Sequence, residues 1–185
     1  MMANIQAVGM IEFNSIAVGI EAADRMVKAA EVEPLMLKTI CPGKFVVAIY
    51  SNVAAVQASI DAGLNVGADA LVDHFVIPNI DPAVISAMSS SIARTSGSAV
   101  GVIETFSAAS CIVAADVAVK TADVDLLEVR IAMGVGGKAF CILAGNVGPV
   151  EMSVASGSAS AAKKGLLVRK TVIPNISQQV MRHIM

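Results

Sequence analysis

Apolar and polar positions follow one order along the chain, and that order occurs twice. A largely apolar run at residues 7–13 predicts a strand, and Asn14 or Ser15 can cap the helix that follows it. In this helix apolar residues recur at spacings of three and four, which predicts one buried face. The predicted face consists of Ile16, Ile20, Ala23, Val27 and Ala30.

The rest of the first half continues with further strands and a second helix. Two β-rich runs, at residues 35–40 and 45–50, flank a tight turn. Asn52 can cap the second helix, residues 71–77 predict a last strand, and a short helix opens near Pro82. The predicted buried face of the second helix consists of Val53, Val56, Ile60, Leu64 and Gly67.

The same motifs return in the second half in unchanged order. Residues 8–12 return with one substitution at 100–104, and residues 76–80 return unchanged at 172–176. Ser107 can cap the second copy of the first helix. Its predicted buried face consists of Ala108, Ile112, Ala115, Val119 and Ala122. Two copies are too few for a solenoid, so the repeat indicates duplicated domains.

This pattern predicts an α+β chain of two tandem domains, residues 1–91 and 99–185. A linker at 92–98, rich in small polar residues, joins them. The order β-α-β-β-α-β predicts a split βαβ unit in each domain, with a four-stranded antiparallel sheet and a short C-terminal helix. The fold alone implies no function.

Composition narrows the class of protein. Hydrophobic residues make up 56% of the chain, yet the longest stretch without a charge, residues 45–60, is too short for a spanning helix. We therefore expect no membrane partner, and we expect the Ala- and Val-rich surplus to serve subunit contacts. A net charge of −2, one Tyr and no Trp argue against a nucleic-acid partner.

Three cysteines and no export signal indicate a reducing cytosol rather than a disulfide framework. Cys111 and Cys141 lie in apolar runs and are expected to be buried. Glu12 and Glu104 recur at the ends of the first strands, where a structural hydrogen bond is favoured over acid–base catalysis. No zinc motif occurs, and the one glycine-rich segment that resembles a phosphate loop lies between two predicted strands rather than before a helix.

These repeated motifs resemble the bacterial microcompartment shell domain family. The family pattern combines a Val-Gly-x-Ile-Glu strand, an Ala-Ala-Asp helix with a following Lys, a Gly-rich turn and a late Val-Ile-Pro, and both halves contain all four. Two fused copies resemble its tandem-domain members. The resemblance implies a homotrimer that forms a pseudohexameric tile in the shell of a cytoplasmic microcompartment, beside other shell proteins. It also implies a structural protein that is not an enzyme.

The resemblance also gives roles to individual residues. Lys28 and Lys120 match the lysine that packs across tile edges. Where many family members carry an Arg after Val-Ile-Pro, this chain has Asn79 and Asn175, which leaves open how those edges bond. The family's pore is lined by the turns between the second and third strands. Here these are Cys41, Pro42, Gly43 and Lys44 in the first half, and Gly134, Val135, Gly136 and Gly137 in the second.

The turn at residues 39–45 is similar to that of a tandem-domain member that holds an iron–sulfur cluster on its three-fold axis. That likeness implies one cluster per trimer, a [4Fe-4S] cluster bound by three copies of Cys41, or a three-iron cluster that needs no fourth ligand. The implied role is electron transfer across the shell, or cluster delivery to enclosed redox enzymes. Two alternatives remain open, a metal-free pore for small metabolites and a duplicated ligand-sensing regulatory module.

Overall fold

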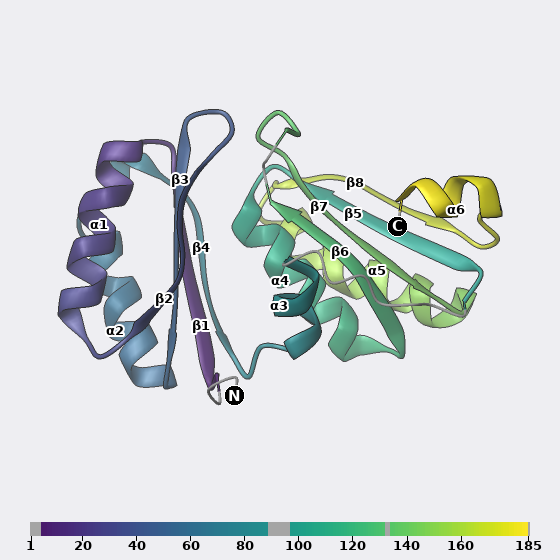
Figure 1. Ribbon diagram of the computed structural model, residues 1–185, viewed down its shortest axis with the longest axis horizontal. Helices are drawn as coiled ribbons and strands as arrows, with labels where there is room; N and C mark the ends of the chain where they lie inside the picture. Colours follow the sequence, from purple (N-terminus) through teal and green to yellow (C-terminus); the bar gives the residue numbers. More distant parts are fainter. Residues whose placement is uncertain (1–4, 89–96, 132–133, 185) are drawn as a thin grey trace. The chain divides into compact units, whose positions relative to one another are not determined.

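The computed structural model describes residues 5–88, 97–131 and 134–184, and they form two compact units (Figure 1). The first unit contains residues 5–80 together with the turn at 134–137. The second contains the remaining described residues. Of the predicted linker 92–98, residues 92–96 lie outside the described part of the chain.

The first unit is a four-stranded antiparallel sheet with two helices on one face (Figure 1). The strand order is β2-β3-β1-β4. Its elements are β1 (Ala7–Phe13), α1 (Ile16–Ala29), β2 (Glu33–Ile40), β3 (Lys44–Ser51), α2 (Val53–Leu64), the 3-10 turn η1 (Ala68–Ala70) and β4 (Leu71–Pro78).

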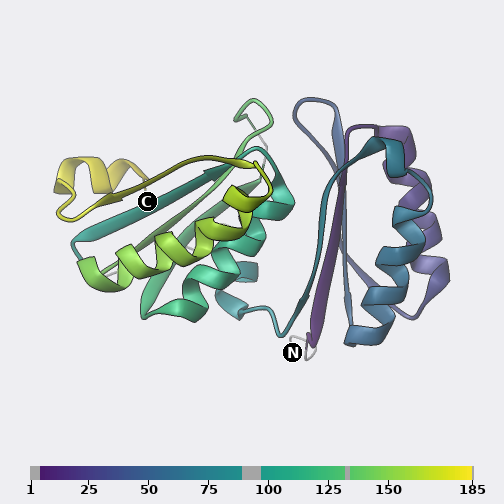
Figure 2. The same ribbon diagram turned by 180° about the vertical axis from the view of Figure 1, so that it is seen from behind.

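The second unit repeats this arrangement, with strand order β6-β7-β5-β8 and with α4 and α5 on one face of the sheet (Figure 2). Its elements are α3 (Pro82–Met88), β5 (Ala99–Thr105), α4 (Ala108–Thr121), β6 (Val124–Ile131), β7 (Ala139–Gly145), α5 (Val147–Lys163), β8 (Leu167–Ile173) and α6 (Gln178–Ile184). The α+β fold with two split βαβ repeats is therefore confirmed.

Side-chain caps begin three of the helices where the sequence predicts them. The Ser15 side chain accepts from Val18 N, Asn52 accepts from Ala55 N, and Ser107 accepts from Ser110 N. Each oxygen satisfies a backbone N–H that the first helical turn leaves without an intrahelical partner. Local sequence thus sets where these helices start.

The predicted buried face of α1 is wrong at three of its five positions. Ile16, Ile20 and Val27 are 39%, 57% and 41% exposed, whereas Gly19 and Met26 face the core. A Cβ at position 19 would lie only 2.6 Å from the Phe45 Cβ, so the helix approaches the sheet along its smallest residues. This close approach turns the larger apolar side chains outward. Ala23 is buried and Ala30 packs against the core, as expected.

The other predicted faces agree better with the structure. Val56 and Ile60 of α2 are fully buried, although Val53 is 44% exposed. In α4, Ala108 and Ile112 are buried, and the buried surface extends beyond the predicted stripe to nearly every side of the helix. Within the described residues, no helix is long and apolar enough to cross a membrane.

Helix α3 lies in the predicted first domain, residues 1–91, but packs in the second unit. It contacts β6 and α4. The backbone N–H of Asp81, just before α3, donates to Asp116 Oδ1 of α4 at 2.8 Å. The segment that follows the first repeat is therefore anchored to the second.

Candidate functional site

The turn between β2 and β3 presents a cysteine to solvent. Cys41, Pro42 and Gly43 are all exposed, and the Cys41–Pro42 peptide bond is cis. Gly43 has a φ of 77°, in the left-handed region that glycine adopts without a steric cost. Glycine at position 43 therefore meets a backbone requirement of the tight turn.

The equivalent turn between β6 and β7 contains three glycines and no thiol. Gly134, Gly136 and Gly137 have φ values of 73°, 61° and 83°, so each occupies the left-handed region. A Cβ at position 134 or 136 would meet no atom within 4 Å. These two glycines therefore meet a backbone requirement, while the surrounding space stays open.

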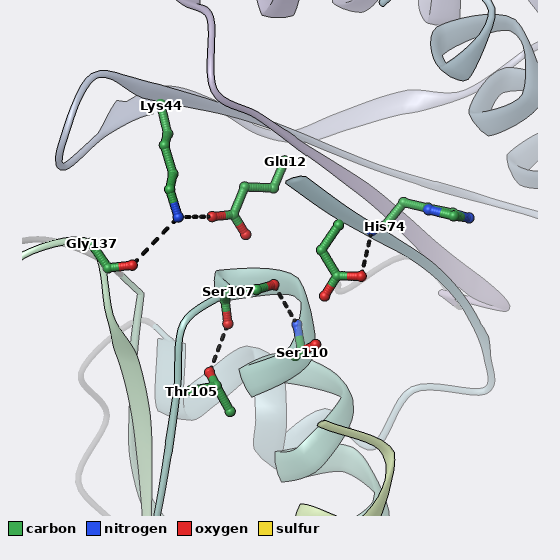
Figure 3. A network of polar contacts seen from close by, with 8 residues as sticks. Glu12, Lys44, His74, Thr105, Ser107, Ser110 and Gly137 are labelled. Carbon is green, nitrogen blue, oxygen red and sulfur yellow. Dashed lines mark hydrogen bonds and ion pairs between the residues drawn. The ribbon is translucent and has the colours of Figure 1, made fainter. Parts of the chain in front are cut away.

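The two turns meet within the first unit. Lys44 Nζ donates to the carbonyl oxygen of Gly137 at 3.5 Å (Figure 3). A Cβ at position 137 would lie 2.6 Å from Pro42 Cδ, so the second turn comes this close only because residue 137 is glycine. The structure thus brings together two of the turns that the sequence assigned to one pore.

A buried ion pair anchors the base of the first turn. Lys44 Nζ lies 2.8 Å from Glu12 Oε1, and the side chains are 14% and 0% exposed (Figure 3). A carboxylate that is fully buried is normally paired in this way. The second repeat has the equivalent pair in a more solvent-exposed position. Lys138 Nζ lies 2.6 Å from Glu104 Oε1, and the Lys138 and Glu104 side chains are 41% and 29% exposed.

Both repeated glutamates therefore have the structural role that the sequence favoured. The sequence interpretation missed their partners, the lysines that follow the turns. One signal could have found them, because Glu12 and Lys44 recur together as Glu104 and Lys138.

The three cysteines lie in two kinds of environment. Cys41 is exposed, whereas Cys111 and Cys141 are fully buried, as predicted. Across the described residues, no group of three or more His, Cys, Asp and Glu side chains could hold a metal ion. A single chain thus offers one accessible thiol at the turn, and a thiolate-bound cluster at this position requires Cys41 from several copies.

The predicted tile-edge lysines end the first helix of each repeat. Lys28 pairs with Asp24 at 2.7 Å, and its side chain is 72% exposed. Lys120 pairs with Asp116 at 2.7 Å and is 39% exposed. A cation in the last helical turn also interacts favourably with the helix dipole. Lys28 borders a hollow of about 540 Å³ that Arg25 and residues at the end of α2 also line.

The predicted edge asparagines follow the last strand of each repeat. Asn79 is exposed with a φ of 52°, a conformation that asparagine tolerates better than most residues. Its backbone N–H donates to Gln6 O at 2.7 Å. Asn175 is also exposed. Among the described residues, no hydrogen bond joins either asparagine side chain to Lys28 or Lys120.

Comparison with known proteins identifies the fold family. The BMC domain family matches residues 7–80 and 99–176, one match in each repeat. The bacterial microcompartment shell protein PduT of Citrobacter freundii is 45% identical over 179 residues, covering 97% of each chain. The carboxysome shell protein CcmK2 of Synechococcus elongatus is 40% identical over 75 residues, about the length of one repeat.

A solved structure extends this likeness to three dimensions. A microcompartments protein from Desulfitobacterium hafniense DCB has 51% sequence identity and a TM-score of 0.82, covering 95% of this chain and 98% of its own. The similarity extends over almost the full length of both chains and therefore includes both repeats. The chain therefore belongs to the BMC domain family of bacterial microcompartment shell proteins, with two copies of the domain in tandem.

Proposed function

We propose that this shell protein forms a homotrimer whose six domains make one pseudohexameric tile, with an iron–sulfur cluster at its centre. The observation that carries the proposal is the contact between the turns, in which Lys44 reaches the Gly137 carbonyl. A ring of three chains that repeats this contact brings six turns around one axis. Three of those turns carry Cys41.

Symmetry supplies the ligands that one chain lacks. Iron–sulfur clusters are held by cysteine thiolates, usually four of them. Three copies of Cys41 suit a three-iron cluster, or a four-iron cluster whose last iron takes a ligand from outside the protein. The turn fits such a group because Cys41 is exposed and a Cβ at Gly43 would meet no atom within 4 Å. Cys111 and Cys141 are fully buried in the chain and are unsuited to this role.

The chain's own residues hold the turn in place. The buried pair of Glu12 and Lys44 fixes the start of β3, three residues after Cys41. When bound, the cluster supplies one-electron transfer. The tile would then pass electrons across the shell or deliver clusters to enclosed redox enzymes.

The exposed helix ends fit the edges of such a tile. Lys28 and Lys120 lie in the last turns of equivalent helices, so a trimer presents six of them around its rim. Through these edges the tile would meet further tiles and other shell proteins. The family assignment favours this arrangement over a ligand-sensing module, since the relatives named above are shell proteins.

Anaerobic visible and electron paramagnetic resonance spectra of the purified protein test the cluster. We expect a brown protein with up to about four irons and sulfides per trimer. Cys41→Ser should be colourless, while the matched control Cys111→Ala should keep the wild-type spectrum because Cys111 is buried. Iron and sulfide assays on the same samples give the stoichiometry.

A colourless wild-type protein after anaerobic reconstitution would overturn the cluster. The tile would then be left with a metal-free pore that conducts small metabolites. The open glycine turn at 134–137 favours this second function, because its positive-φ backbone can present N–H groups to a polar solute.

A further inference from the structure

The short helix after the first repeat occupies a well-packed position on the second unit. Helix α3 packs against α4 and β6, and its Val84 and Ala87 are 0% and 2% exposed. The backbone N–H of Asp81 donates to Asp116, whose side chain is only 7% exposed. Both apolar burial and a hydrogen bond thus fix α3.

The equivalent helix after the second repeat is packed much less completely. Residues 76–80 return as 172–176, so α6 corresponds to α3 and Val180 corresponds to Val84. Val180 is 50% exposed. Met181 of α6 belongs to the same cluster of buried residues as Ile142, and no other α6 residue is buried. Helix α6 lies on the sheet face opposite α4 and α5 (Figure 2). The face of α6 that matches the buried face of α3 is therefore uncovered.

Helix α3 packs on α4 and β6, and the corresponding surface of the first unit, on α1 and β2, is exposed. On α4 and β6, Ile112 and Val129 are 2% and 4% exposed. The equivalent positions on α1 and β2 are Ile20, which is 57% exposed, and Leu37, which is 45% exposed. Asp24 corresponds to the buried Asp116 and has a side chain that is 57% exposed. Leu37 and Val129 occupy equivalent positions in their sheets. Leu37 pairs with Val47 of β3, and Val129 pairs with Cys141 of β7, the residue that corresponds to Val47.

We propose that α6 of one copy docks on the α1/β2 surface of a second copy, in the arrangement that α3 takes on α4 and β6. The proposal rests on the trimer proposed above and names the element that closes it. The contact is heterologous, since each copy presents α6 to one neighbour and receives α6 from the other, and such contacts close into rings. His183 stands where α3 has Ala87, so the receiving surface must hold a larger side chain.

Two charge substitutions, one on each partner surface, test this docking. Ile20→Asp alters the receiving surface and Val180→Asp alters the docking helix, and both positions are at least half exposed in one chain. We expect each variant to sediment as a monomer at a concentration where the wild type is a trimer. The control Val53→Asp, at a 44% exposed position on α2, should remain trimeric.

Co-expression of the two variants with different affinity tags tests the direction of the contact. Ile20→Asp keeps an intact α6, and Val180→Asp keeps an intact α1/β2 surface, so the two variants together can form one unaltered contact. Complexes recovered through both tags should be heterodimers, and their formation shows that each variant is folded.

Trimers of both single variants beside a trimeric wild type would overturn the docking and leave the tile intact. Recovery of no heterodimer would also overturn it. A monomeric wild type would contradict the trimer itself, which separates failure of the proposed function from failure of this inference.

Discussion

The two repeats share a fold and a Glu–Lys pair but place them in different surroundings. In the first repeat Glu12 is fully buried and Lys44 is 14% exposed. In the second, Glu104 and Lys138 are 29% and 41% exposed. The same pair is thus part of the interior in one half and borders solvent in the other. Both repeats retain the ion pair, but its contribution to the free energy of unfolding depends on how far each pair is removed from water.

The contact between the first helix and the sheet shows a second kind of difference. In the first repeat Gly19 lies against the ring of Phe45. The corresponding residues in the second repeat are Cys111 and Ala139, both fully buried. The helix residue is thus larger in the second repeat, Cys instead of Gly, and the strand residue is smaller, Ala instead of Phe. The second pair is smaller in total, so the larger helix residue only partly replaces the volume of the missing phenyl ring.

The largest expected effect comes from breaking the buried pair. Glu12→Ala leaves the Lys44 ammonium without its carboxylate and should destabilise the fold by about 3–5 kcal/mol. Glu104→Ala removes a partly exposed pair and should cost about 1 kcal/mol or less. Denaturant midpoints at one fixed protein concentration measure both. Equal losses for the two variants would refute the contrast.

Truncating one isoleucine in each first helix sharpens the comparison of the helices. Ile112→Ala removes a side chain that is 2% exposed and should cost about 2–5 kcal/mol at any protein concentration. Ile20→Ala should change the stability of a dilute chain by about 0.5 kcal/mol or less. Its effect should grow with concentration, because Ile20 acts through docking of a second copy. A concentration series of thermal melts tests this, and a flat series for Ile20→Ala would argue against the docking.

Exchanging the packed pair between repeats is expected to have a moderate effect. Gly19→Cys places a side chain against Phe45 and should destabilise the protein by about 1–3 kcal/mol through overpacking. Adding Phe45→Ala recreates the pair of the second repeat. The double variant should be more stable than the sum of the two single effects predicts, which a double-mutant cycle measures. Simple additivity would mean that the two positions do not compensate.

The smallest expected effect concerns two asparagines at equivalent helix starts. The Asn52 side chain accepts from Ala55 N at 2.9 Å, so Asn52→Ala should cost about 1 kcal/mol. Asn146 precedes α5 at the same position, but in the described structure its side chain makes no capping hydrogen bond. Asn146→Ala should therefore cost clearly less. Thermal melts of the two variants side by side make the test, and a larger loss at Asn146 would reverse the prediction.

The sequence by itself determined the order of the elements, the duplication and the helix starts. The signals for these features are local: apolar runs with a period of two, glycines in the turns, and capping side chains at Ser15, Asn52 and Ser107. Each acts on the backbone within a few residues, so its effect does not depend on the tertiary structure. The repeat of Glu12 as Glu104 also indicated a structural carboxylate. The exposed Cys41 turn was found from the turn pattern together with the family resemblance.

Only the tertiary structure decided which face of α1 is buried and what each repeat covers. Periodicity favoured Ile20 of α1 as a core residue, but α1 meets the sheet along Gly19, and no described helix of the first unit takes the α3 position to cover Ile20. The equivalent Ile112 is buried, although the two helices share their motif. Packing depends on the neighbouring side chains that the fold supplies, and the spacing of apolar residues within one helix does not contain that information.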